Sequence, residues 1–137
     1  MERLIYILDT NVIGDRMKAV QPVSQLLIDK ASEGHTIYLC QPVYYEVRRG
    51  LLKTKALSKL NFFQTTVLPL LDWLPLQNTD WEQAAEFWAK TKNAGQQLSD
   101  TDLLIAALTK QLDAVLVTAD NDFDSLPIKR ENWRTRP

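Results

Sequence analysis

The stretch that decides the fold is residues 4–9, Leu-Ile-Tyr-Ile-Leu-Asp, in which five apolar residues in a row end at a carboxylate. A continuous apolar run of this length predicts a β-strand that is buried on both faces, as in a parallel sheet. In open parallel sheets, ligands bind beyond the carboxyl ends of the strands. Asp9 therefore stands where a functional residue is expected.

Further strands and helices alternate along the chain. Strands are predicted at 36–40, 74–76, 114–117 and, as a short last strand, near residue 128. Helices are predicted over 23–32, 42–53, 56–72, 79–93 and 103–111. Two of them begin at capping-box spacings, Thr79 with Glu82 and Ser99 with Asp102. This alternation predicts an α/β fold with three layers, α/β/α, around a central parallel sheet of four or five strands.

The composition is that of an ordinary globular protein. The 137 residues suit a single domain over 1–137, with 45% apolar and 24% charged residues. The lone Cys40 excludes an internal disulfide and fits a reducing compartment. No export signal and no stretch long enough to cross a membrane is found, so we expect a cytoplasmic protein. A net charge of -1 does not by itself indicate a nucleic-acid partner, although it can hide separated charges.

Carboxylates recur at the positions that border the predicted end of the sheet. Asp9 and Asp120 follow strands, and Glu46 lies early in the helix after the second strand. Asp102 lies in the first turn of the helix that precedes the strand at 114–117. Carboxylates in one pocket repel one another, and a hard divalent cation that prefers oxygen ligands removes this cost. If the four acids meet, they predict a site for Mg²⁺ or Mn²⁺.

Each acid also has a purely structural interpretation, and the spacing alone leaves both interpretations open. The structural roles are capping of a short helix for Asp9, a solvated helix position for Glu46, a capping-box partner for Asp102, a first-turn charge for Asp100, and turn formation for Asp120 and Asp122.

Four motifs, in order, resemble those of the PIN-domain nucleases. They are Leu-Asp-Thr-Asn-Val at 8–12, Tyr-Glu-Val-Arg-Arg-Gly-Leu at 45–51, Ser-Asp-Thr-Asp-Leu-Leu-Ile-Ala-Ala at 99–107 and Leu-Val-Thr-Ala-Asp-Asn-Asp-Phe at 116–123. Each motif alone is weak, but the ordered set is specific and covers nearly the whole chain. The chain length and the dense helices between 42 and 72 are similar to the VapC toxins of bacterial toxin–antitoxin pairs.

The resemblance implies a PIN-like domain that acts as a metal-dependent endoribonuclease, a hydrolase of RNA phosphodiester bonds. The implied catalytic and metal-binding acids are Asp9, Glu46, Asp102 and, at the more variable fourth position, Asp120. The implied supporting residues, which would orient the acids through hydrogen bonds, are Thr10, Asn11 and Thr118. Asp100 and Asp122 lie nearby, and we do not expect either to be a primary ligand.

The resemblance also implies binding partners, and two alternative functions have to be weighed against the nuclease. Members of the family form homodimers and are held inactive by a cognate antitoxin whose segment fills the active-site groove. A non-catalytic PIN-like module that binds RNA or protein is the alternative, and the intact acidic set argues against it. A phosphotransfer domain also places an aspartate after its first strand, but it would need a second acid where this chain has Asn11 or an apolar residue.

Several other features have a functional and a structural interpretation. The basic stretch 48–59 could hold an RNA backbone or a protein partner, or it could be a solvated helix face. The lone His35 follows a turn at Gly34, and we do not expect it to act as a general base. Cys40 is expected to be a buried apolar residue. The remaining aromatic residues are expected in the core or an interface rather than stacked on bases: Trp81, Phe87, Trp88 and, as an anchor for the C-terminus, Trp133.

Overall fold

In the described part of the chain, five parallel strands form one sheet, in the order β3-β2-β1-β4-β5. The strands are β1 (Ile5–Leu8), β2 (Thr36–Cys40), β3 (Asp72–Leu74), β4 (Val115–Val117) and β5 (Lys129–Glu131). The computed structural model describes residues 2–135, so residues 1, 136 and 137 lie outside the described part. The predicted central parallel sheet is confirmed, with β1 in the middle of it.

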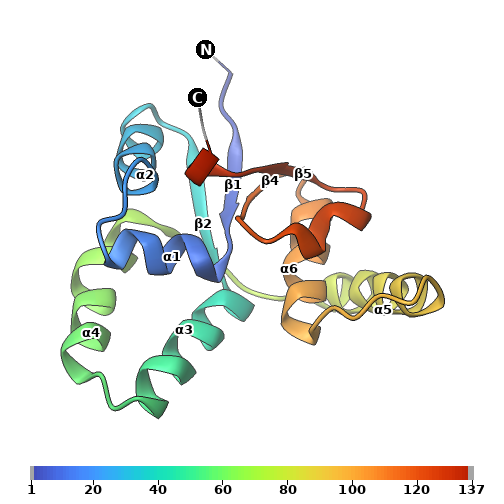
Figure 1. Cartoon of the computed structure of the whole chain (residues 1–137). Helices are drawn as coiled ribbons and strands as arrows, with labels where there is room; N and C mark the ends of the chain where they lie inside the picture. Colours follow the sequence, from blue (N-terminus) through green and yellow to red (C-terminus); the bar gives the residue numbers. More distant parts are fainter. Residues whose placement is uncertain (1, 136–137) are drawn as a thin grey trace.

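Within residues 2–135, six α-helices flank the sheet: α1 (Thr10–Met17), α2 (Val23–Ser32), α3 (Gln41–Lys53), α4 (Leu57–Phe62), α5 (Asn78–Asn93) and α6 (Asp100–Gln111). In Figure 1, α1, α2 and α4 lie to the left of the strands and α5 and α6 lie to the right, which makes the sheet the middle layer. The predicted α/β/α architecture is confirmed. Among residues 2–135, no helix is both long enough and apolar enough to cross a membrane.

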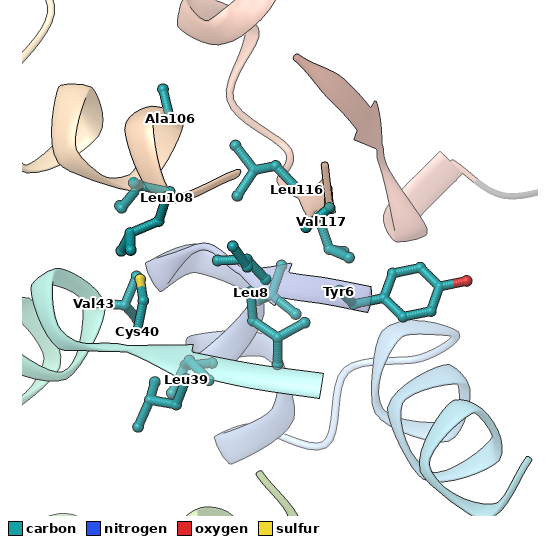
Figure 2. Close-up of a cluster of buried hydrophobic side chains, with 14 of the residues drawn as sticks. Tyr6, Leu8, Leu39, Cys40, Val43, Ala106, Leu108, Leu116 and Val117 are labelled. Carbon is teal, nitrogen blue, oxygen red and sulfur yellow. The ribbon is translucent and has the colours of Figure 1, made fainter. Parts of the chain in front are cut away.

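The core is built around β1, because this strand is covered on both faces. Ile7 and Leu8 are completely buried, and burying one such side chain stabilises the fold by about 1.5–3 kcal/mol. Leu8 lies in the buried cluster that Figure 2 shows, and its register partner on β4 is Val117. Cys40 is buried in the same cluster, and burial raises the pKa of its thiol to about 12. The expectation of a buried cysteine is confirmed.

Residues 56–72 differ from the single helix that was predicted. Helix α4 ends at Phe62 and continues as one π-helical segment and one 3-10 turn, up to Leu70. Strand β3 then begins at Asp72, two residues earlier than expected, because it pairs in parallel with Tyr38 to Cys40 of β2. Pro75 has no N–H to donate to the sheet, so the strand ends before it.

The starts of three helices can be compared with the predictions. Residues 10–17 form the helix α1 with Asp9 as its cap, as in the structural interpretation of Asp9, and this helix extends well beyond Asn11. The capping box of α5 is formed by Gln77 and Asp80, not by Thr79 and Glu82: the Gln77 N–H donates to Asp80 Oδ2 over 2.8 Å. The Ser99 cap was predicted correctly, since its hydroxyl accepts the N–H of Asp102 over 3.1 Å.

The aromatic residues divide between core and surface. Phe87 and Trp133 are buried, and the Trp133 ring meets the Tyr6 ring edge-on at 5.6 Å, so the predicted C-terminal anchor is confirmed. Trp81 and Trp88 lie exposed on α5, outside the core. The side chain of His35 is buried, and its Nδ1 accepts the N–H of Leu4 over 3.0 Å, a structural role.

Candidate metal centre

The strand order changes direction between β1 and β4, and this switch point positions the candidate site. From β1 the chain builds outward through β2 to β3, and then returns to place β4 on the other side of β1. Ligands bind at such a switch point in open α/β sheets. Asp9 stands at the end of β1, and its N–H donates to the carbonyl of Val117 at the end of β4 over 2.9 Å. Thr118 and Asp120 follow at once.

Asp9 is buried and held by hydrogen bonds from three residues. Its Oδ1 accepts the backbone N–H of Thr10 over 2.8 Å, which makes Asp9 the cap of α1. Its Oδ2 accepts the Thr118 hydroxyl over 2.7 Å and the Asn11 side-chain amide over 3.1 Å. Helix capping and a role in the site are therefore compatible, because they use different oxygens.

Asn11 and Thr118 also fix the loop that follows β4. The side-chain oxygen of Asn11 accepts the N–H of Ala119 over 3.2 Å. The hydroxyl oxygen of Thr118 accepts the N–H of Asp120 over 3.0 Å. Two segments more than a hundred residues apart in the chain are thus tied together around Asp9.

Glu46 enters the site from the first half of α3. The Thr10 hydroxyl donates to Glu46 Oε1 over 3.2 Å, so Thr10 contacts two of the predicted acids. Arg49, one turn further along α3, places its Nη2 at 3.9 Å from Glu46 Oε2. The Glu46 side chain is mostly shielded from solvent and is not the freely solvated helix residue of the structural interpretation.

Asp102, Asp120 and Asp122 form a compact group of carboxylates. Each offers one oxygen, and these three oxygens lie within 4.8 Å of one another. Asp102 projects from the first turn of α6, while the other two flank Asn121 in a turn in which Asp120 Oδ1 accepts the N–H of Asp122 over 2.9 Å. This turn brings Asp122, which was not expected to be a ligand, beside two of the predicted acids.

The acids influence one another electrostatically. Desolvation raises the pKa of Asp102 to about 6, and the charges of Asp9, Asp120 and Glu46 add to this rise. Burial also raises the pKa of Asp9, against the hydrogen bonds from Thr118 and Thr10. Burial and the charge of Asp9 raise the pKa of Glu46, while the Thr10 hydrogen bond and Arg49 lower it. These mutual effects place the four predicted acids in one electrostatic unit.

The donor set of this unit fits a hard divalent cation. It consists of carboxylate oxygens, which Mg²⁺ and Mn²⁺ prefer, and within residues 2–135 neither histidine nor thiol joins the group. A cation would relieve the repulsion that raises these pKa values. Asp100 lies exposed at the start of α6 and is not part of the compact group.

A cavity of about 470 Å³ opens beside Glu46, between α1, α3 and α4. Apolar side chains make up most of its walls, and Lys18 and Lys59 add positive charge. Thr10 and Glu46 line it as well, so the cavity adjoins the acids. It is lined by Thr10, Ile13, Gly14, Met17, Lys18, Glu46, Val47, Gly50, Leu51, Ser58, Lys59 and Phe62.

Comparison with protein families decides what this site belongs to. The family model described as "PIN domain" matches residues 6–129. The chain belongs to the PIN domain family. The family match includes all four predicted acids, and no sequence match to a curated protein reaches significance.

Solved structures place the chain near the VapC branch of the PIN domains. A chain of VapBC2 from Rickettsia felis, solved with promoter DNA, is 26% identical over 95% of this chain and 99% of its own length, with a TM-score of 0.81. FitAcB from Neisseria gonorrhoeae is 25% identical over 96% and 99%, with a TM-score of 0.79. DNA-bound VapBC from Salmonella typhimurium shares the fold, with a TM-score of 0.84 at 20% identity over 95% and 98%. The recognition of a VapC-like PIN domain is confirmed.

The strand order also excludes one of the alternative functions. Response-regulator domains of the flavodoxin-like type have the order 2-1-3-4-5, in which the third strand lies beside the first. Here β3 lies at the edge beyond β2, and β4 lies beside β1. A phosphotransfer domain of the response-regulator type is therefore excluded.

Proposed function

We propose that this PIN domain is a Mg²⁺- or Mn²⁺-dependent endoribonuclease and the toxin of a toxin–antitoxin pair. The observation that carries the proposal is the buried Asp9, held by three donor residues at the switch point, within electrostatic reach of Glu46, Asp102 and Asp120. A non-catalytic module would gain nothing from keeping several carboxylates together, because their mutual repulsion destabilises the fold.

The acids would hold the cation, and the neighbouring residues would hold the acids. Asp9, Glu46, Asp102 and Asp120 are the proposed ligands, and Asp122 is close enough to contribute. When bound, the cation lowers the pKa of a water, orients the phosphate and offsets charge on the leaving oxygen. Thr10, Asn11 and Thr118 keep Asp9 and Glu46 in fixed orientations, as supporting residues around a metal do.

The deciding experiment is RNA cleavage by the purified protein with Mg²⁺ or Mn²⁺. Asp9→Asn and Asp102→Asn should each abolish cleavage, whereas Asp100→Asn, on the same helix but outside the compact group, should cleave like the parent protein. Equal cleavage by all four proteins would mean that a contaminating nuclease acts or that the site assignment is wrong. A protein that binds RNA without cutting it would favour the non-catalytic module.

The role of Asp122 can be separated from that of its neighbours in the turn. If its carboxylate helps to hold the cation, Asp122→Asn should weaken Mn²⁺ binding measured by calorimetry. Asp124→Asn is the matched control, because Asp124 lies in the same turn but pairs with Arg130. Identical Mn²⁺ affinities for the two variants would remove Asp122 from the ligand set.

The cavity beside Glu46 supports an antitoxin partner. Its apolar walls suit an apolar segment of a second protein, and its proximity to the acids lets a basic side chain of that segment reach them. VapBC2 from Rickettsia felis and FitAB were solved bound to DNA fragments, and VapBC-5 from Mycobacterium tuberculosis, which shares the fold, belongs to the VapBC family of toxin–antitoxin systems. A short reading frame for a DNA-binding protein beside this gene, whose product co-purifies with this chain and blocks cleavage, is the expected result.

The homodimer implied by the family is supported by the exposed face of α5. Trp81 and Trp88 are seven residues apart and therefore lie on the same face of α5, and both are exposed. Together with Ala85 they line a cavity of about 300 Å³ between α5 and α6. Large exposed apolar patches of this kind mark protein interfaces. Trp88→Glu should convert the dimer into a monomer, and light scattering would measure this change in molecular mass.

We place the protein in the cytoplasm, where RNA and a reduced Cys40 are both expected.

A further inference from the structure

Two adjacent tyrosines on α3 have opposite environments. Tyr44 is half-buried and packs against Phe63 at 5.9 Å and edge-on against Trp73 at 5.4 Å, between ring centroids. Tyr45 is 57% exposed and lies outside the hydrophobic core. The fold therefore uses Tyr44 for packing, and the ring of Tyr45 remains accessible directly beside Glu46.

Arg49 joins Tyr45 to the acidic site. Its guanidinium carbon lies 4.8 Å from the centroid of the Tyr45 ring, a cation–π contact. Its Nη2 also lies 3.9 Å from Glu46 Oε2. Tyr45 and Arg49 thus form a cation–π pair, and both side chains are more than half exposed at the border of the proposed metal centre.

The charges on this side of α3 suit a nucleic-acid strand. Glu46, Arg49 and Lys53 lie at positions i, i+3 and i+7, on one face of the helix, so two cations follow the acid in a row. Arg48 projects from nearly the opposite side, since it is two residues, or about 200°, away from Glu46. The backbone phosphates of an RNA strand that runs from the acids along this face of α3 would contact Arg49 and then Lys53.

We propose that Tyr45 and Arg49 form a stacking platform for an unpaired nucleobase next to the scissile phosphate; this inference rests on the proposed ribonuclease function. Bases of single-stranded RNA stack on aromatic rings and on arginine planes, whereas the bases of an A-form duplex are stacked inside the helix. The platform therefore selects single-stranded or looped RNA. Tyr45 is a specificity-determining residue, and the bond chemistry stays with the acids.

Base stacking and RNA binding can be measured in a variant that does not cleave RNA. An Asp102→Asn background keeps the RNA intact, and short single-stranded oligoribonucleotides that carry the fluorescent base 2-aminopurine report stacking by quenching. Tyr45→Leu should abolish most of the quenching and weaken binding about 5- to 150-fold. Tyr45→Phe should retain both, because it keeps the ring. Arg49→Ala should weaken binding, and Arg48→Ala, its neighbour on the other side of α3, should do so much less.

The outcomes separate this inference from the proposed function. If Tyr45→Leu in the Asp102→Asn background quenches 2-aminopurine and binds RNA as well as that background does, the platform is overturned. The ribonuclease function then still stands if Tyr45→Leu with Asp102 intact cleaves RNA. If Tyr45→Leu leaves RNA binding intact but lowers the molecular mass in solution, Tyr45 belongs to a protein interface and the inference is equally overturned. If the unsubstituted protein cleaves no RNA, the proposed function itself fails. Tighter binding to a duplex than to its single strands would also contradict the platform.

Discussion

The Thr118 hydroxyl donates a 2.7 Å hydrogen bond to Asp9 Oδ2 across 109 positions of the chain. The same hydroxyl oxygen accepts the N–H of Asp120. One buried side chain thus orients a carboxylate at the end of β1 and fixes the loop after β4. The geometry of the site therefore depends directly on Thr118, as it does on Asn11, which also bonds to Asp9 and to the loop after β4.

We expect Thr118→Val to weaken the site without unfolding the protein. Valine has nearly the same shape, so the core stays packed, but Asp9 loses a donor. Loss of such a supporting partner typically weakens metal affinity about 10- to 100-fold. Thr91→Val is the matched control: Thr91 is also buried, and its hydroxyl donates to carbonyls within its own helix α5, away from the acids. Calorimetry with Mn²⁺ that gave equal affinities for both variants would contradict the role of Thr118.

The metal-free protein should become more stable when Asp102 is neutralised. The pKa of Asp102 is about 6 in the folded state and about 3.9 in the unfolded chain, so between these pH values the folded state binds more protons. The free energy of unfolding therefore falls as pH rises through this window, and the destabilisation is complete above it.

The measurement is urea unfolding of Asp102→Asn at about pH 8 and about pH 4, without divalent cations. Because Asp102 is half-buried and screened by solvent, we expect a gain of about 1–2 kcal/mol at the higher pH, less than the roughly 3 kcal/mol to which the full pKa shift corresponds. At the lower pH the gain should vanish. Asp100→Asn, exposed on the same turn of α6, removes the same formal charge and should show no such pH-dependent gain.

Cation binding should strengthen as pH rises, whereas the stability of the metal-free protein falls. Protons compete with the cation for Asp102, so the Mn²⁺-induced rise in melting temperature should be large at about pH 7.5 and small at about pH 5. The change should be centred near the Asp102 pKa of about 6. A melting-temperature rise that is the same at both pH values would show that the cation binds away from this carboxylate.

The C-terminal turn should stabilise α1 through one ion pair. Arg134 donates from Nε and Nη2 to the two oxygens of the mostly buried Asp15, over 2.7 and 2.9 Å. Arg134→Met should lower the free energy of unfolding by about 1–3 kcal/mol, because it leaves a buried carboxylate without its charged donor. Lys129→Met, which breaks an exposed pair with Asp113, should cost less than about 1 kcal/mol. Equal losses in urea unfolding would argue against this assignment.

The sequence by itself determined the elements that depend on local pattern. The apolar run before Asp9 predicted a strand buried on both faces, and Ser99 predicted the cap of the helix that carries Asp102, because caps and side-chain patterns act over a few residues. The order of the acidic motifs indicated the family for the same reason: it is read along the chain.

Tertiary structure alone decided which residues meet. Asp72 became the start of β3 because it pairs with Tyr38, and Asp122 joined Asp102 because a tight turn folds its carboxylate toward α6. Residues 44 and 45 are both tyrosine and adjacent in sequence. Only the packing of α3 leaves Tyr44 half-buried and Tyr45 exposed. Such contacts depend on distances between segments far apart in the chain, which no local pattern of side chains specifies.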